Sequence, residues 1–180
     1  MVYMKILIFI SLLLKILPSN AQPENAMKDE SPIELFAKVS KQLDYSNYSR
    51  LAQMLGFDVA KVETSKLTTS NDKTNSIQST HVVFANTART AISKATKNAD
   101  FNSFASQKGI TRVTLNVALE SNAICITKED FLEYFSPVNS ISSTDGGIGL
   151  SHEFNDTNKR VVWATFDRRG CVNMFVLMQN

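Results

Sequence analysis

The feature that most constrains the fold is an alternation from Val113 to Leu119, in which large apolar residues are separated by Thr114, Asn116 and Ala118. Apolar side chains at every second position share one face of an extended strand, and the residues between them share the other face. Further strand candidates lie at residues 148–154, 160–166 and 171–178. The polar segments 155–158 and 167–170 have the composition of hairpin turns. The last third of the chain therefore predicts an antiparallel sheet.

Helix signals occur at three other places. Ser31 to Glu34 has the pattern of a capping box with a proline in the first turn, and apolar residues then recur at helical spacing. A second helix is predicted over residues 46–55 and ends at Gly56. A third begins at Thr127, has an acidic first turn and stops before Pro137.

Between these signals the pattern is weaker. Residues 64–80 are rich in Ser, Thr, Asn and Lys, which predicts a mobile loop, and residues 81–84 predict a short strand. Residues 90–105 predict either a short helix or an irregular segment. Residues 139–147 predict a turn-rich loop that ends in Asp-Gly-Gly.

Residues 1–21 have the three parts of a secretory signal peptide. Lys5 supplies the positive charge, Ile6 to Leu14 form an apolar run interrupted only by Ser11, and small residues precede the expected cleavage site after Ala21. The run is too short to span a bilayer, which needs about 20 apolar residues. We expect a mature chain of 159 residues (180 minus 21) with a flexible lead-in over residues 22–30. An uncleaved N-terminal anchor is the alternative.

Removal of this segment changes the net charge. Two of the 19 Lys and Arg residues are lost, which leaves 17 against 17 Asp and Glu, so the mature chain is formally neutral. A neutral chain without a basic cluster argues against a nucleic-acid partner and against attachment to an anionic membrane. We expect no stable membrane insertion after signal cleavage.

The chain contains two cysteines, Cys125 and Cys171, which lie 46 positions apart. In an exported protein an even number of cysteines predicts a disulfide, because the compartment is oxidising. Two buried free thiols are the alternative. Metal ligation is disfavoured because no short Cys-x-x-Cys or His-x-x-His spacing occurs, and we expect no metal and no cofactor.

Together these elements predict an α+β fold in which helices pack on a curved antiparallel sheet. Residues 31–122 and 123–180 each read as a helix, a polar loop and then strands, which predicts two tandem helix-plus-sheet halves. A single undivided α+β domain is the alternative.

The segment from Ile124 to Leu132, taken with Phe175 to Leu177, resembles the module of the β-lactamase inhibitor protein family of small exported bacterial proteins. In that module a helix packs on a curved antiparallel sheet, and a cysteine before the helix pairs with one in a late strand, where Cys125 and Cys171 lie. The resemblance implies a binding protein whose concave sheet face grips a partner, often an enzyme to be inhibited.

Catalytic signatures are scarce in the sequence. Neither a Gly-x-Ser-x-Gly elbow nor a phosphate-binding Gly-x-x-x-x-Gly-Lys-[Ser/Thr] loop occurs. His81 and His152 are the only histidines, so a secreted or periplasmic hydrolase would depend on one of them as its base. Both histidines lie in segments with strand patterns, where a structural or surface role is commoner than a catalytic one.

Binding candidates lie in the last third of the chain. Trp163 is in a strand with apolar residues on both faces, and an exposed tryptophan would serve as a binding anchor. The alternative is that both faces are covered within the protein by the first helices. The loop around Ser142, Asp145 and Gly147 is the second candidate, because it would project from the sheet.

We therefore expect a periplasmic or secreted, non-enzymatic binding protein. Its expected partner is another protein, an enzyme or a toxin, which it would inhibit or neutralise as an inhibitor or immunity protein. A hydrolase and an envelope assembly or structural protein are the alternatives.

Overall fold

The computed structural model describes residues 30–42, 44–68, 76–106, 109–142 and 148–180. The expected signal peptide, residues 1–21, and all but the last residue of the expected lead-in lie outside these ranges. The elements, in chain order, are α1 (Pro32–Ser40), α2 (Tyr48–Leu55), β1 (Phe57–Thr68), β2 (Ser76–Asn86), α3 (Ala91–Ala95), β3 (Thr96–Ser106), β4 (Gly109–Leu119), α4 (Lys128–Tyr134), β5 (Asn139–Ser142), β6 (Ile148–Glu153), β7 (Arg160–Phe166) and β8 (Val172–Gln179).

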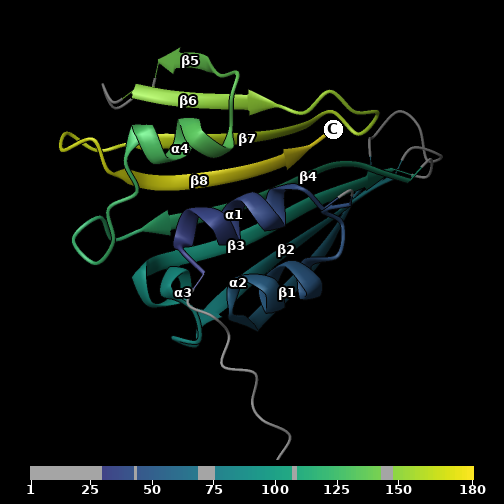
Figure 1. Ribbon diagram of the computed structural model, residues 1–180. Helices are drawn as coiled ribbons and strands as arrows, with labels where there is room; N and C mark the ends of the chain where they lie inside the picture. The colour runs from purple at the N-terminus through teal and green to yellow at the C-terminus, as the bar shows by residue number, and fades with distance from the viewer. Residues whose placement is uncertain (1–29, 43, 69–75, 107–108, 143–147) are drawn as a thin grey trace, which may run out of the picture.

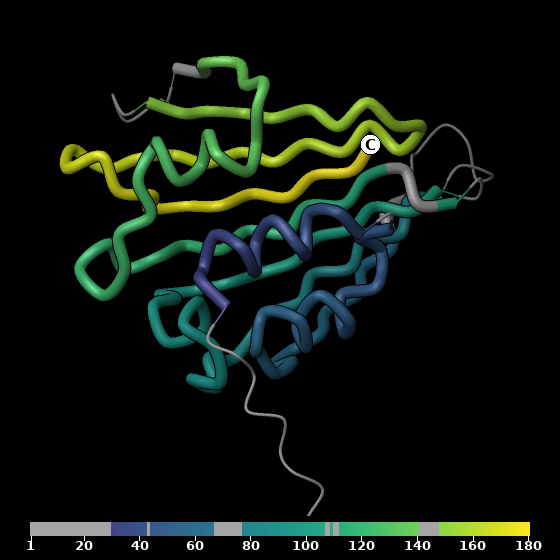
Figure 2. The backbone as a smooth tube through the Cα atoms, viewed as in Figure 1, coloured from purple at the N-terminus to yellow at the C-terminus, as the bar shows by residue number. Residues whose placement is uncertain are grey.

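The strands of the described residues form one antiparallel sheet of eight, in the order β1-β2-β3-β4-β8-β7-β6-β5. Strands β1 to β4 follow one another as neighbours, and so do β5 to β8 (Figure 1). The two runs meet where β4 pairs with β8, from Val113 opposite Gln179 to Ala118 opposite Met174. The backbone trace in Figure 2 shows the same arrangement, with both runs in one continuous layer.

Helices α1, α2 and α4 lie over one face of this sheet (Figure 1). The core forms between them and the sheet, where Phe36 of α1 stacks on Phe175 of β8 with ring centroids 3.9 Å apart. Phe131 of α4 packs near the same Phe175 ring at 6.1 Å. Along β7 the residues that face the helices are buried, and those between them are only half-buried. The other face of the sheet therefore carries no described helix.

The predicted helix ends are confirmed. At Ser31 the side chain accepts from the Glu34 N–H, while the Glu34 carboxylate accepts from the Ser31 N–H. Thr127 caps α4 in the same way through Asp130. Helix α2 ends at Gly56, whose φ of +79° is a left-handed conformation that favours glycine.

The predicted fold class is wrong, because strands make up much more of the fold, and helices less, than the sequence pattern predicts. The described chain is dominated by one open antiparallel sheet with a few short helices, and its two runs of four strands belong to that single sheet. Four strands of 11 or 12 residues, β1 to β4, account for most of the difference. Only two short parts of these strands were predicted, residues 81–84 and 113–119.

The missed strands have a physical explanation. The segment predicted as a loop over residues 64–80 contains the end of β1 and the start of β2, and residues 69–75 lie outside the described ranges. The described side chains here are exposed or half-exposed, so burial imposes no alternation of apolar residues. In β3, Asp100 and Asn102 occupy the uncovered face, and both residue types are depleted in strands. The short β5, Asn-Ser-Ile-Ser, was predicted as loop because its residues are also mostly polar.

Candidate functional site

Trp163 lies on the face of the sheet that no described helix covers. It pairs with Val176 of β8, whereas its neighbours Val162 and Ala164 are fully buried on the helix side. The prediction that the first helices cover both faces of this strand therefore does not hold in the described structure. We call this uncovered side of the sheet the outer face.

Register fixes which residues share the outer face, because directly opposed residues of neighbouring strands point to the same side. One row crosses all the described strands: Asn139, Ser151, Trp163, Val176, Asn116, Asp100, Val83 and Lys61. A second, parallel row runs through Glu153, Val161, Met178, Thr114, Asn102, His81 and Glu63.

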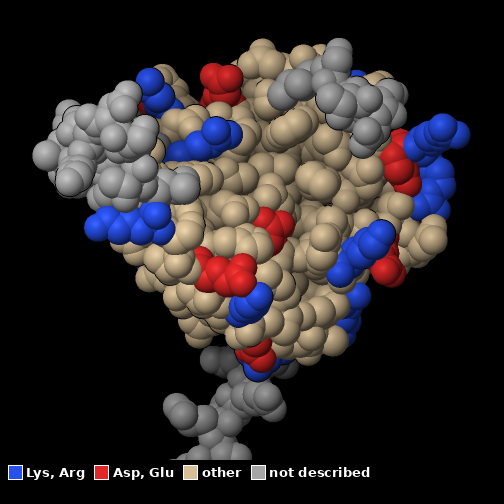
Figure 3. Space-filling model, turned by 180° about the vertical axis from the view of Figure 1, so that it is seen from behind, with Lys and Arg blue, Asp and Glu red and all other residues tan. Residues whose placement is uncertain are grey.

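The part of the outer face over β7 and β8 is mainly apolar, although Thr165 also lies on it. Its apolar side chains form what we call the apolar patch: Val161, Trp163, Met174, Val176 and Met178. Met174 is 39% exposed, and Trp163 is half-buried. Figure 3 shows this side of the molecule as mostly uncharged, with acidic groups near its middle and most Lys and Arg side chains toward its rim. An apolar patch on a sheet face that a chain leaves uncovered is typical of an interaction surface.

The indole of Trp163 has an unusual environment. Its Nε1 atom is buried, yet among the described residues it has no hydrogen-bond partner. A buried donor without a partner costs about 1–3 kcal/mol. Trp163 is thus the one described side chain whose N–H would gain from a change in its surroundings.

Next to the apolar patch, the outer face becomes polar over β3 and β4. One oxygen of Asp100, Oδ2, accepts hydrogen bonds from the amides of Asn102 at 2.7 Å and Asn116 at 3.1 Å. These three side chains are half-buried. The two amides thus hold this carboxylate oxygen in place on β3 and β4.

His81 lies further along the same face, toward the edge of the sheet. Its Nδ1 is 3.7 Å from Glu63 Oε2, and Lys61 Nζ is 2.5 Å from Glu63 Oε1. The hydrogen bond from Lys61 is the main reason that the pKa of Glu63 is lowered. All three side chains are largely exposed, so the group is a surface ion cluster rather than a desolvated catalytic pair.

His152 lies on the other side of the sheet, since it pairs with the buried Val162. Its Nδ1 is 2.9 Å from the carbonyl oxygen of Pro137, and its ring meets Phe154 edge-on at 4.7 Å. The structure therefore keeps the two histidines on opposite faces and gives His152 a packing environment. The geometry adds no argument for a hydrolase.

The predicted loop at residues 142–149 can be placed only in part. Asp145 and Gly147 lie outside the described residues, and Ser142 ends β5 opposite Ile148. The role predicted for this loop stays a prediction.

The predicted disulfide is confirmed. The sulfurs of Cys125 and Cys171 are 1.89 Å apart, with the Cα atoms at 4.8 Å. The bond joins the segment before α4 to the start of β8, and Val172 N–H donates to the Ile126 carbonyl beside it at 2.9 Å. Close by, Ser121 donates to Asp167, which lowers the pKa of that carboxyl to about 2.

Sequence reasoning missed Arg160, which is 5% exposed. Its guanidinium donates to Asp156 at 2.7 Å and to the carbonyls of Ser40 and Gln42, and it lies 4.7 Å from the Phe154 ring. The Ser40 carbonyl also accepts from the Tyr45 hydroxyl, and burial raises the pKa of that phenol. These contacts fasten the C-terminus of α1 to the β6–β7 hairpin. Arg160 lies two residues before Val162, so both side chains point to the inward face of β7. This spacing was the sequence signal that could have identified Arg160 as buried.

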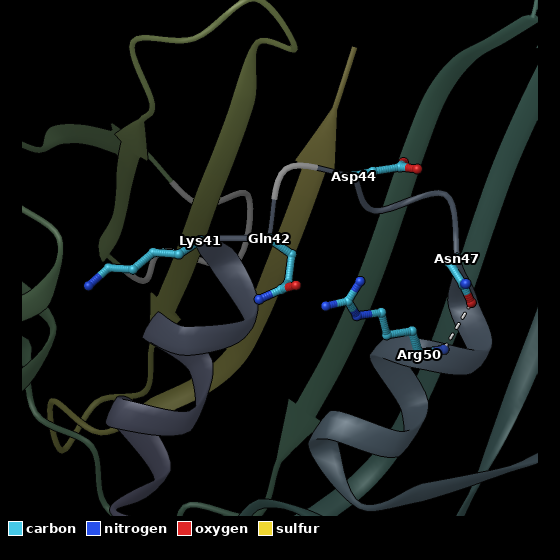
Figure 4. Close-up of a pocket in the computed structure, with 5 residues that line it drawn as sticks. All are labelled: Lys41, Gln42, Asp44, Asn47 and Arg50. Atoms are coloured by element: carbon cyan, nitrogen blue, oxygen red, sulfur yellow. Dashed lines mark hydrogen bonds between the residues drawn. The ribbon is translucent and has the colours of Figure 1, made fainter.

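A cavity of about 370 Å³ lies between the end of α1 and the start of α2. Figure 4 shows Gln42 and Arg50 turned toward each other across it, while Lys41 and Asp44 point away in opposite directions. Asp44 accepts from the Ser46 backbone at 2.7 Å and shapes its own turn, and the Asn47 side chain caps α2. The lining mixes both charges in an open depression, so it favours no particular ligand.

No protein-family model, curated protein or solved structure matches the chain. The resemblance to the β-lactamase inhibitor protein family therefore stays a prediction. Among the residues that the structure describes, no helix is long and apolar enough to cross a membrane.

Proposed function

We propose that this protein is exported and acts by binding another protein through the apolar patch of the outer face, with Trp163 as the anchor. The observation that carries the proposal is the apolar patch on the sheet face that no described helix covers, with the half-buried Trp163 within it. Tryptophan is among the residues that dominate binding energy at protein interfaces. The disulfide is consistent with an oxidising compartment such as the periplasm or the cell exterior.

The unpaired N–H of Trp163 is a thermodynamic reason for a partner to bind at this residue. In the free protein this buried donor lacks a partner among the described residues. A partner that offers an acceptor and lets the ring reorient would remove a cost of about 1–3 kcal/mol. Binding at the patch would also bury Met174, which is 39% exposed.

The class of partner rests on the sequence resemblance alone. A sheet face is the gripping surface in the β-lactamase inhibitor protein family, whose partners are often enzymes. We therefore propose that the partner is an enzyme or toxin whose activity falls on binding, as with an inhibitor or an immunity protein.

The proposal is tested with the disulfide-bonded mature chain immobilised against an extracytoplasmic extract of the source cells. Met174→Lys places a charge in the apolar patch, and Val59→Lys is the matched control, because Val59 is 40% exposed on the helix side of β1. We expect a protein that the wild type and the control retain and that Met174→Lys and Trp163→Ala lose. Equal retention by all four chains, or no retained protein, would overturn the proposal.

A second measurement tests the inhibitory role. The retained protein is purified and its activity is titrated with the wild type and with Trp163→Ala. We expect the wild type to reduce the activity at a stoichiometric ratio and the variant to require a higher concentration. Binding without any change in activity would leave the binding surface intact and remove the inhibitor assignment.

A further inference from the structure

The outer edge of β1 is an open edge of the sheet, because β1 pairs with β2 and stands last in the strand order. Every described side chain from Asp58 to Lys66 is exposed. Beyond the bulge between Val59 and Lys61, pairing with β2 is regular as far as Thr68. A long regular edge presents a row of backbone donors and acceptors that can pair with another strand.

The charges along this edge are self-complementary. Lys61 and Glu63 lie two residues apart on the outer face, and Val62 lies between them on the helix face, where it is 45% exposed. When a strand pairs antiparallel with a copy of itself, the residue at the two-fold axis faces its own copy. An axis at Lys61 or at Glu63 would set like charges opposite each other, which is destabilising. An axis at Val62 sets Lys61 opposite the copy's Glu63, and the reverse.

We propose that two copies of this chain join edge to edge through β1, antiparallel, about a two-fold axis at Val62. The dimer then contains two reciprocal Lys61–Glu63 ion pairs and a Val62–Val62 contact, and the two sheets become continuous. Since the axis is perpendicular to the sheet, both outer faces lie on the same side.

This arrangement does not depend on the proposed function, but it would extend it. Two apolar patches on one side of a continuous sheet make the dimer bivalent toward a partner that carries two matching sites. A monomeric partner would bind each patch separately.

Charge reversal tests the register. Lys61→Glu and Glu63→Lys each set like charges opposite each other twice, so we expect the dissociation constant to rise about tenfold to a hundredfold. The double reversal restores two opposite pairs and should restore dimerisation. Sedimentation equilibrium of the mature chain at low salt, at concentrations up to about 1 mM, measures this.

Thermal unfolding of the same variants separates the dimer from a local role. Lys61 and Glu63 also pair within one strand, so a purely local role would move the melting temperature and leave the association state unchanged. That result, or a wild type that stays monomeric at all concentrations, would overturn the proposal. So would a β1 edge that binds a strand of another protein in place of a second copy.

A cysteine scan gives an independent check, because the two native cysteines are bonded to each other. Val62→Cys would face its own copy and form a covalent dimer under mild oxidation. Thr64→Cys is the matched control: it is on the same face, but its copy lies about four residues, or roughly 13 Å, away. Cross-linking through position 64 and not through position 62 would refute the register.

Discussion

At the scale of single residues, strand β7 carries two buried polar groups, one with hydrogen-bond partners and one without. Arg160 is buried on the helix side and donates to Asp156 and to two backbone carbonyls. Trp163 lies on the outer face, and its buried N–H has no partner among the described residues. A buried polar group with hydrogen-bond partners is compatible with a stable fold. A buried polar group without a partner costs stability, and its presence in a native protein calls for an explanation such as a functional role.

We expect Arg160→Met to lower the free energy of unfolding by about 3 kcal/mol or more, because Asp156 and two carbonyls lose their donor. Arg169→Met is the control, since Arg169 makes similar contacts to Asp167 but its side chain is 54% exposed. Its loss should be much smaller. Urea denaturation of both variants measures the difference, and equal losses would contradict this role for Arg160.

Trp163→Phe removes the unpaired donor while keeping an aromatic ring. We expect stability within about 1 kcal/mol of the wild type, because the lost contact area is offset by the loss of an unsatisfied group. Tyr45→Phe serves as the contrast: its hydroxyl donates to the Ser40 carbonyl, so about 1 kcal/mol should be lost. A larger loss for Trp163→Phe than for Tyr45→Phe in the same denaturation experiment would mean that the indole N–H is paired.

At the scale of elements, helix ends were predictable and strands were only partly so. The caps at Ser31, Thr127 and Gly56 depend on residues within one turn, so the local sequence contains the whole signal. Strand β4 was found because burial on one side imposes an alternation, whereas β6, β7 and β8 were found as strand candidates separated by turn segments. Strand β1 was missed because its described side chains beyond Phe57 are exposed on both faces, and backbone pairing with β2 stabilises it.

The end of α2 provides a test of local geometry. A Cβ at Gly56 would lie 2.6 Å from the Thr90 side chain, in addition to the strain of a positive φ. Gly170→Ala is the control, since Gly170 has a φ of +81° and no neighbour within 4 Å. We expect both variants to lose about 1–2 kcal/mol from the backbone and Gly56→Ala to lose more. Thermal unfolding compares them; a smaller loss at Gly56 would show that Thr90 moves aside.

The turn between β7 and β8 predicts a pH dependence. The pKa of Asp167 is lowered to about 2, chiefly by the hydrogen bond from Ser121. Its folded pKa lies below that of an unfolded aspartate, about 3.9, so its contribution to stability is complete above about pH 4 and lost as the pH falls toward 2. Asp167→Asn should flatten that part of the stability curve, and Ser121→Ala should raise the pKa of Asp167 in an NMR titration. An unchanged slope in Asp167→Asn would contradict this assignment.

At the scale of the whole molecule, the disulfide and the β4–β8 pairing join segments far apart in the sequence. Cys125 and Cys171 close a loop with a sequence separation of 46. We expect Cys125→Ser/Cys171→Ser to lose about 3–4 kcal/mol, because the unfolded chain is no longer constrained. A reducing agent should destabilise the wild type by a similar amount and leave the variant unchanged. Equal stability of both proteins under oxidising conditions would show that the bond contributes little.

The sequence by itself determined the capped ends of α1, α2 and α4, the inward face of β4 and the single possible cysteine pair, because each depends on local spacing or on there being just two thiols. Only the tertiary structure decided that the strands join into one open sheet and which face of β7 the helices leave uncovered. Strand order and face coverage depend on contacts between residues distant in the chain. A strand with apolar side chains on both faces is compatible with either side turned outward, so the packing of α1, α2 and α4 left Trp163 on the outer face and buried Arg160.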